Sequence, residues 1–485
     1  MFNQKNKVTR ADYEQWRAGQ DETAARIASD PDRLLFHVEP ELGWLNDPNG
    51  LVQIGDTYHI YHQYDPFDAA HGGPVLWNHL TTKDFVTYEN HGPVLFPDSD
   101  LDSSGAYSGS AFVRDGKIHY FYTGNVKHFD RDDYDYVLTG REQNQIHVVA
   151  ENPDELGEKR IAVGPVDYPD DIGTHVRDPK ILEHDGIYYM VLGARTKDDR
   201  GCVLVYTSRN LEDWSYATRI ELGEKFGFMW ECPGYLELEA DGGVPAKWLS
   251  FSPQGLEGGR WDRGNVYAAG YMPVTGDITG GDSAYDLGEF HLWDAGFDFY
   301  APQEFASEDG RHILIGWMGM PDADYGNAPT VAHGWQHCFT VPRLLTKGEN
   351  GTLLQTPVPE LDARRSAAAL TLRNGEEASL SPCFDLTAAP AGDFALTVAH
   401  GVELVYTEQD STCVLQFTDP AQASGRTQRR TKLSAPCRSV RVVGDRSSLE
   451  IFLNDGAAVF STRYYPAAGD VAVKISGTDA LVYSL

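Results

Sequence analysis

The order of apolar and polar residues changes from a helical period to a β-strand period near residue 34. Before this point, Thr9 to Ser29 reads as one helical stretch, because Thr9 suits an N-cap and Trp16 and Ile27 lie on a thin apolar stripe. The pattern predicts an N-terminal helical arm over residues 1–30 that docks on the rest of the chain.

From there on, short aromatic and β-branched runs alternate with polar residues, and Gly, Asp and Asn separate them, which predicts strands joined by tight turns. A similar unit recurs five times: a polar corner, a strand, a tight turn and a second strand. The corners are Asp47-Pro48, Tyr107-Ser108, Arg177-Asp178, Glu231-Cys232 and Phe299-Tyr300. Five units of about four strands, at intervals of roughly 50–70 residues, predict a five-bladed β-propeller over residues 31–356.

The rest of the chain predicts a second β domain. Residues 357–369 are expected to form a linker with a short helix, and alternation returns from residue 370. Asn454-Asp455-Gly456 is a strong hairpin signal, and an all-β domain over residues 370–485 favours a β-sandwich. The basic residues between Arg426 and Lys432 are expected to lie in a solvated loop. The predicted fold class is therefore all-β, a five-bladed β-propeller followed by a C-terminal β-sandwich.

The propeller geometry bears on function, because the innermost strand of every blade lines one central axis. Asp47, Asp178 and Glu231 would then meet at one end of that axis. Taken alone, Asp47 is more typical of a turn cap, since Asp-Pro and Asn-Gly favour turns. Three converging carboxylates instead suit glycoside hydrolysis, which needs a proton donor for the leaving oxygen and a carboxylate facing the anomeric carbon.

The composition of the chain argues against several classes of binding partner. The 485 residues carry a formal charge of −32, which argues against nucleic acid or an anionic membrane as partner. The six cysteines are scattered singly, without zinc spacing. The N-terminal residues are polar, and no apolar run is long enough to span a bilayer. We expect a cytoplasmic protein with reduced thiols that acts on a small molecule, with its oligomeric state left open.

Two sequence patterns that resemble metal-binding motifs lack residues or structure that such motifs require. The acidic run from Asp130 to Asp135 lacks the glycine at position 6 and the glutamate at position 12 of an EF-hand loop. His333 and His337 stand four residues apart, but Gly334 argues against the helix that such a pair needs. The sequence therefore predicts no metal and no cofactor.

Three motifs carry a resemblance to a known family. They are Trp44-Leu45-Asn46-Asp47-Pro48-Asn49-Gly50, Arg177-Asp178-Pro179 and Glu231-Cys232-Pro233-Gly234. Together they resemble the signature motifs of glycoside hydrolase family 32, which comprises invertases, fructan hydrolases and sucrose-6-phosphate hydrolases. Residues 298–303 and 445–452 are also similar to that family, so the resemblance covers nearly the whole chain. Family members pair a five-bladed propeller with a β-sandwich.

The resemblance implies a retaining glycoside hydrolase. It would release terminal β-D-fructofuranosyl units from sucrose, sucrose 6-phosphate or short fructo-oligosaccharides through a covalent fructosyl-enzyme intermediate. Asp47 would be the nucleophile, Glu231 the general acid and then base, and Asp178 the residue that stabilises the transition state. The expected fructose pocket has polar residues and apolar walls: Asn46, Gln63, Tyr107, Ser108 and Arg177, with Trp44, Trp77 and Tyr300. Trp77-Asn78-His79 departs from the family's Trp-Gly-His.

The chemistry requires Asp47 to be ionised while Glu231 is protonated. Burial of Glu231 against Trp230 and Cys232 would raise the pKa of its carboxyl group, although Cys232 is equally consistent with a small packing residue. Two alternatives stay open. A fructosyltransferase would share all three carboxylates, whereas a non-catalytic fructoside-binding propeller would be expected to have lost one. The default role of the C-terminal domain is to buttress the propeller.

Overall fold

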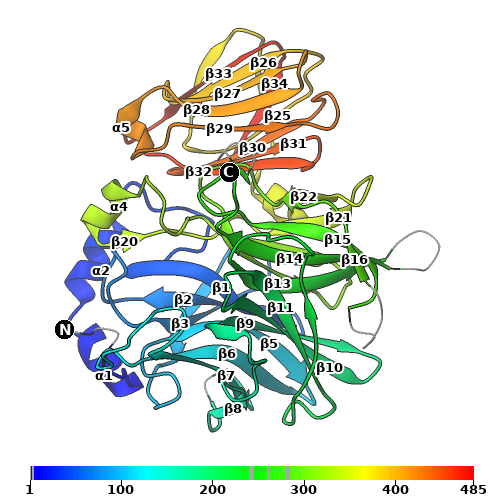
Figure 1. Ribbon diagram of the computed structural model, residues 1–485. Coiled ribbons are helices and arrows are strands. Elements are labelled where there is room, and N and C mark those ends of the chain that lie inside the picture. Colours follow the sequence, from blue (N-terminus) through cyan, green and yellow to red (C-terminus); the bar gives the residue numbers. More distant parts are fainter. Residues whose placement is uncertain (1, 3–4, 154, 240–244, 259–262, 279–284) are drawn as a thin grey trace.

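The computed structural model describes residues 2, 5–153, 155–239, 245–258, 263–278 and 285–485, so residues 1 and 3–4 of the predicted arm lie outside the described part. The described chain is mostly β (Figure 1). Strands before residue 358 form a propeller-like set of sheets, and strands after residue 369 form two sheets that pack face to face. None of the described helices is long and apolar enough to cross a membrane.

Five antiparallel sheets make up the N-terminal part of the described chain. The first contains β1 (Gly43–Ile54), β2 (Thr57–Asp65), β3 (Leu76–Thr82) and β4 (Glu89–Leu95), with the short β20 (Trp335–Gln336) added parallel to β1. The second contains β5 (Ala106–Arg114), β6 (Lys117–Lys127), β7 (Arg141–Ala150) and β8 (Arg160–Val163). The third contains β9 (Ile172–His184), β10 (Ile187–Thr196), β11 (Gly201–Ser208) and β12 (Ser215–Ile220).

The fourth sheet contains β13 (Met229–Leu238), β14 (Ala246–Gln254), β15 (Gly270–Gly276), β16 (Tyr285–Leu287) and β17 (His291–Leu292). The fifth contains β18 (Tyr300–Ala306), β19 (His312–Trp317), β21 (Arg343–Lys347) and β22 (Leu353–Pro357). The first strands contact one another in order: β1 with β5, β5 with β9, β9 with β13, and β13 with β18. β18 also contacts β1, so the strand that opens each sheet faces a common centre.

Four of the five motifs predicted as corners before strands lie inside strands, which corrects that prediction, whereas Phe299 precedes β18 and Tyr300 is its first residue. Each first strand carries a register irregularity next to its motif residue, for example between Leu45 and Pro48 in β1 and between Glu231 and Gly234 in β13. The pairing of β5, β9 and β18 is interrupted in the same way. β-bulges redirect side chains and occur next to active sites. Here they aim the motif side chains toward the shared centre while the strands continue.

The N-terminal arm is two helices and not the single helix predicted from Thr9 to Ser29. α1 (Arg10–Arg17) begins with a capping box in which Thr9 and Asp12 bond each other's backbone N–H, and α2 (Asp21–Ala28) follows after a break at Gly19. The break lets Trp16 and Ile27 pack in one cluster with the buried Trp335. Tertiary burial therefore outweighs continuation of the helix.

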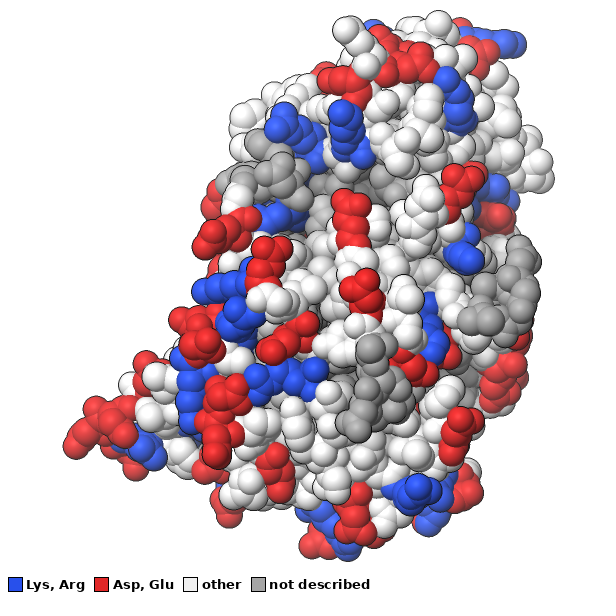
Figure 2. Space-filling view, turned by 45° about the vertical axis from the view of Figure 1, so that its right-hand side comes forward, with Lys and Arg blue, Asp and Glu red and all other residues white. Residues whose placement is uncertain are grey.

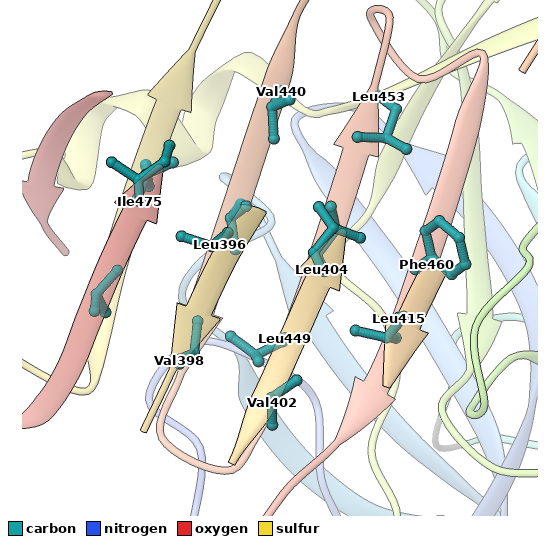
Figure 3. Packing of buried hydrophobic residues seen from close by; sticks show 14 of the residues in the cluster. Leu396, Val398, Val402, Leu404, Leu415, Val440, Leu449, Leu453, Phe460 and Ile475 are labelled. Atoms are coloured by element: carbon teal, nitrogen blue, oxygen red, sulfur yellow. The ribbon is translucent and has the colours of Figure 1, made fainter. Parts of the chain in front are cut away.

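The C-terminal sheets have six strands each. One contains β23 (Leu370–Leu372), β34 (Ala480–Ser484), β25 (Cys383–Ala388), β30 (Val440–Asp445), β31 (Ser448–Leu453) and β32 (Ala458–Arg463). The other contains β24 (Glu377–Leu380), β33 (Val471–Ser476), β26 (Phe394–Val398), β27 (Val402–Thr407), β28 (Thr412–Phe417) and β29 (Gln428–Lys432). Figure 3 shows Leu396 and Leu404 of one sheet packing against Leu449 and Phe460 of the other. This is the predicted sandwich, with apolar residues alternating inward.

Three short helices connect or edge these sheets. α4 (Ala328–His333) ends at Gly334, which is left-handed with φ of 102°, so His337 lies beyond the helix. The 3₁₀ helix η1 (Pro359–Arg364) occupies the segment predicted as a linker with a short helix. α5 (Pro420–Ala423) precedes β29. On the surface, acidic and basic side chains are interspersed over the face in Figure 2, without a continuous basic area.

The basic residues predicted to lie in a solvated loop are partly buried in the interface between the two parts of the chain, which corrects that prediction. Arg426 is 2% exposed and donates two hydrogen bonds to the Asp298 carboxylate, at 2.6 and 2.7 Å. Arg429 is 1% exposed and donates to Asn265 at 2.5 Å. The reason is that loops of the N-terminal part, which carry Asn265 and Asp298, supply acceptors, so each guanidinium is buried with a partner.

A second buried polar cluster holds the two parts together at His37. Its Nδ1 is 2.8 Å from the Asp445 carboxylate and its Nε2 is 3.1 Å from the Glu450 carboxylate, and all three side chains are fully buried. Glu450 also accepts a hydrogen bond from Arg343 of the fifth sheet at 2.7 Å. Burial disfavours the charged imidazole, but the two carboxylates outweigh burial and raise the pKa of His37 to about 9.

We expect His37→Leu to lower the free energy of unfolding by on the order of 3–5 kcal/mol at pH 7, because the buried Asp445 carboxylate loses its ion pair and Glu450 keeps only Arg343. Since the pKa of His37 is raised, its stabilisation is full below about pH 6.5 and is lost as the pH rises through about 9. Urea unfolding at pH 6.5 and pH 9.5 measures both effects. The variant should lack this alkaline loss, and His400→Leu, at an exposed histidine of the C-terminal sandwich, is the control. Equal alkaline loss in wild type and His37→Leu would contradict the assignment.

Candidate active site

The bulged ends of the first strands line a cavity of about 450 Å³. Its lining includes the three carboxylates of the motifs, Asp47 from β1, Asp178 from β9 and Glu231 from β13. The remaining lining residues are Trp44, Asn46, Gln63, Ala70, His71, Val75, Tyr107, Ser108, Tyr136, Arg177, Cys232, Gln254, Tyr300, Trp317, Pro321 and Asp322. Residues separated by up to 278 positions along the chain thus share one wall, because the first strands face a common centre.

Asp47 is held by hydrogen bonds from both sides. Ser108 donates to Oδ2 through its hydroxyl group, and Asn46 Nδ2 donates to Oδ1 at 3.1 Å. Asn46 is itself fixed, since its amide also donates to Gln63 at 3.0 Å and its Oδ1 accepts from the Trp44 indole at 3.0 Å. Burial raises the pKa of Asp47, and the hydrogen bonds from Ser108 and Asn46 act against this rise. The pKa of Asp47 is raised overall, and the two donors orient its carboxylate and limit that rise.

Glu231 is contacted by three donors. Arg177 Nη1 donates to Oε1 at 3.1 Å, while Gln254 Nε2 and the Tyr300 hydroxyl donate to Oε2 at 2.8 and 2.7 Å. Burial raises the pKa of Glu231, which Arg177 and the Tyr300 hydrogen bond oppose, and the nearby Asp47 charge adds to the rise. A carboxyl group with a raised pKa that faces a second carboxylate suits the donation of a proton.

Asp178 has the most strongly raised pKa of the three, about 7, because burial and the charges of Glu231 and Asp47 outweigh the opposing charge of Arg177. Its backbone is left-handed, with φ of 64°, and its N–H donates to the Thr123 hydroxyl at 3.0 Å. Oδ2 accepts from the Cys232 N–H at 2.8 Å, and Cys232 is also left-handed with φ of 48°. Non-glycine residues in this region cost free energy and cluster at functional sites.

Cys232 also links the carboxylates in space. Cys232 directly follows Glu231 in sequence, and its buried thiol lies 3.9 Å from Asp47 Oδ2. Burial, together with the charges of Asp178 and Asp47, raises the pKa of this thiol well above its usual range. The thiol is therefore neutral and packs among the carboxylates.

Trp77 is the one predicted pocket residue outside the lining. Its ring is fully buried in a core cluster with Tyr61 and Tyr120, and its indole N–H donates to the Tyr107 carbonyl at 3.0 Å. Trp77 thus supports the strand that carries Ser108 and does not form an apolar wall. Asn78, the departure from the expected motif, is buried and donates to Asn90 at 3.0 Å.

Several lining residues were missed by sequence reasoning. Gln254 ends β14 and reaches Glu231 only because β14 pairs with β13. Trp317 ends β19 opposite Tyr300, and His71 stacks on Trp44 with ring centroids 4.8 Å apart. Their only local signal is a position at the end of a strand or in a loop. No group of three or more His, Cys, Asp or Glu in the described chain is arranged to hold a metal ion.

Comparison with known sequences identifies the family. Residues 37–357 match the sequence profile described as "Glycosyl hydrolases family 32 N-terminal domain", and residues 349–481 match "Glycosyl hydrolases family 32 C terminal". The chain belongs to glycoside hydrolase family 32. It is a glycoside hydrolase, which confirms the resemblance found in the sequence motifs.

Relatives within glycoside hydrolase family 32 cover almost the whole chain. The sucrose-6-phosphate hydrolase of Bacillus subtilis (strain 168) is 34% identical over 93% of this chain and 92% of its own length. That of Klebsiella pneumoniae is 36% identical over 89% and 88%. Among solved structures, the sucrose-6-phosphate hydrolase of Lactobacillus gasseri superposes with a TM-score of 0.86 at 27% identity, covering 99% of both chains. A β-fructofuranosidase of Bombyx mori reaches 0.82 at 26% identity, covering 98% of both chains.

Proposed function

We propose that this glycoside hydrolase releases terminal β-D-fructofuranosyl units with retention of configuration, through a covalent fructosyl-enzyme intermediate. The observation that carries the proposal is the convergence of Asp47, Asp178 and Glu231 on one cavity. Retaining enzymes need one carboxylate as nucleophile and a second carboxyl group that first donates and then accepts a proton. The donors around each carboxyl group support distinct roles for them.

Asp47 is the proposed nucleophile. Ser108 and Asn46 leave its carboxylate oriented, so that it attacks the anomeric carbon of the fructosyl unit while the bond to the leaving oxygen breaks. Glu231 is the proposed general acid, which gives its proton to that oxygen. In the second step Glu231 takes a proton from water, and the water oxygen displaces Asp47 from the sugar.

Asp178 is proposed to hydrogen-bond the sugar hydroxyl groups and to stabilise the oxocarbenium-like transition state. Its buried position in the same cavity as the other two carboxylates supports this role. Asn46, Gln63, Tyr107, Ser108 and Arg177 are the proposed polar contacts of the fructosyl unit, and Trp44 and Tyr300 its apolar walls. Trp77 is not proposed as a wall.

The proposed substrates are sucrose 6-phosphate, sucrose and short fructo-oligosaccharides, with sucrose 6-phosphate first because the relatives from Bacillus subtilis and Klebsiella pneumoniae bear that hydrolase name. The proposed scaffold is a closed five-bladed propeller over residues 31–356, supported by the contact of β18 with β1, with a sandwich over residues 370–485. A reducing, cytoplasmic location is proposed as well, supported by six buried free thiols.

The test combines stereochemistry with substrate preference. NMR at early times should show fructose released as the β-anomer, because two displacements at the anomeric carbon restore its configuration. Parallel kcat/KM values on sucrose 6-phosphate, sucrose and 1-kestose should be highest for sucrose 6-phosphate. The α-anomer as first product would contradict the retaining mechanism, and fructosyl transfer to sugar in place of hydrolysis would favour a transferase.

A further inference from the structure

His175 lies between two arginine side chains directly behind the cavity wall. Its Nδ1 accepts a hydrogen bond from Arg177 Nη2 at 2.5 Å. Its Nε2 is 3.1 Å from Arg141 Nη1 and 3.1 Å from the carbonyl oxygen of Tyr136. The ring is 4% exposed and does not line the cavity, so the proposed reaction gives it no direct contact with substrate.

The hydrogen-bond partners favour one neutral tautomer of this ring. A guanidinium group can only donate, and Arg177 is the partner of Nδ1 at 2.5 Å, so Nδ1 accepts. Nε2 faces both the Tyr136 carbonyl, which can only accept, and Arg141 Nη1, so a proton on Nε2 satisfies Arg177 and Tyr136 together and leaves Arg141 as a close neighbour. Nε2–H then donates to the Tyr136 carbonyl. Burial, followed by the charges of Arg177 and Arg141, lowers the pKa of His175 far below its usual range. The ring therefore remains an uncharged acceptor throughout the working pH range of a glycosidase.

Arg177 is shared between this acceptor and the proposed general acid. Its Nη1 donates to Glu231 Oε1 at 3.1 Å, while its Nη2 is bound to His175. Guanidinium and carboxylate groups otherwise tend to pair through two parallel hydrogen bonds, which favour the ionised carboxylate. Because His175 occupies one nitrogen, a single nitrogen of Arg177 contacts Glu231.

We propose that His175 is a positioning residue whose Nδ1 restrains the Arg177 guanidinium so that only one of its nitrogen atoms reaches Glu231. This inference rests on the proposed role of Glu231 as general acid. The charged and titratable groups that face Glu231 come from five strands and one loop: Arg177 and Asp178 of β9, Asp47 of β1, Tyr300 of β18, Arg141 of β7, Cys232 of β13 itself and the loop residue Tyr267. His175 contacts two of these groups, Arg177 at 2.5 Å and Arg141 at 3.1 Å, and of the two it is Arg177 that also donates a hydrogen bond to Glu231.

A pair of variants of equal size separates the acceptor from the packing of the ring. His175→Asn places an amide oxygen near the position of Nδ1, whereas His175→Leu fills the same space without an acceptor. In His175→Leu, Arg177 is free to turn both nitrogen atoms toward Glu231. The basic limb of the kcat/KM profile, which reports the general acid of the free enzyme, should then move to lower pH by on the order of one unit. His175→Asn should keep the wild-type limb.

A second measurement does not depend on activity. The titration of the Glu231 carboxyl carbon, followed by ¹³C NMR in the folded protein, should move to lower pH in His175→Leu and stay in place in His175→Asn. His175→Gln, which offers an amide near Nε2 and nothing near Nδ1, should behave like His175→Leu and replaces it if the leucine variant does not fold. His147→Leu, at a buried histidine of β7 outside the cavity, is the control and should leave the Glu231 titration unchanged.

The two readouts distinguish the possible failures. Equal titration of Glu231 in His175→Asn and His175→Leu, whether shifted or not, would overturn the positioning role and leave His175 as a packing residue. A shifted carboxyl titration with an unshifted rate profile would support the restraint on Arg177 but would contradict Glu231 as the general acid. A shift in both measurements supports both.

Discussion

Replacing Asp47 by asparagine is expected to lower kcat on sucrose or sucrose 6-phosphate by on the order of 10⁴–10⁶-fold, as for other catalytic nucleophiles. The amide retains the shape of the carboxylate and can still accept from Ser108, so the fold and substrate binding should persist. What is lost is the nucleophile itself, since an amide oxygen does not form the covalent fructosyl intermediate. Single-turnover and steady-state rates on the same substrate measure the loss.

The activity of this variant should stay low on every substrate, because no leaving group replaces a missing nucleophile. Asp56→Asn, at an exposed aspartate that ends the β1–β2 turn and pairs with Lys83, is the matched control and should retain wild-type rates. Circular dichroism and the unfolding midpoint establish that the Asp47 variant is folded. A folded Asp47→Asn protein with more than about a hundredth of wild-type kcat would remove Asp47 from the nucleophile role.

The second large effect is expected at Glu231. Replacing it by glutamine should lower kcat on sucrose by on the order of 10²–10⁴-fold, because proton transfer to the leaving oxygen is lost. Glutamine has the size and shape of glutamate, and its single oxygen can accept from Tyr300 and Gln254 at the Oε2 position, so the cavity should keep its shape. The first step should recover with a fructoside whose leaving group needs no proton, such as a nitrophenolate.

Recovery of the first step with an activated leaving group would identify Glu231 as the proton donor. With an activated leaving group, Glu231→Gln should give a burst of phenolate followed by slow turnover, since water is no longer deprotonated in the second step. Glu237→Gln, at the opposite end of the same strand, is the control and should match wild type. Equal loss on sucrose and on the activated fructoside would show that Glu231 is not the proton donor.

The burial of these carboxyl groups is consistent with both proposed roles in one cavity. Burial is the largest cause of the raised pKa of Asp47, Asp178 and Glu231 alike, so the hydrogen-bond donors decide how they differ. Asp47 accepts hydrogen bonds from the Ser108 hydroxyl and the Asn46 amide, both neutral donors. Glu231 accepts from the Arg177 guanidinium, which also donates to His175. Differences of this kind allow one carboxyl group to attack while another donates a proton.

Local sequence was sufficient for the parts of the protein that depend on neighbouring residues. Strand alternation reports burial on one face, so the β-rich fold and the sandwich were predictable. The three motifs around Asp47, Asp178 and Glu231 were sufficient for the family, because their residue types, order and spacing are specific together. Thr9 was predictable as a cap for the same reason, since its partner is three residues away.

The surroundings of individual side chains were decided only by the tertiary structure, because they depend on residues that are distant in sequence. The alternation of apolar and polar residues predicts that a side chain is buried, but not which residues cover it. Trp77 is therefore predicted in the cavity although it packs in a core, and Arg426 is predicted in solvent although it is buried with Asp298 as its partner. The helical arm is interrupted at Gly19, because the break allows both Trp16 and Ile27 to pack in one cluster with Trp335. Gln254 and His175 act through strands that pair or pack from elsewhere. Sequence alone thus determined the family and the β-rich fold and pointed to the three carboxyl groups proposed to react, whereas the protonation and orientation of these groups follow from contacts that form only when the sheets meet.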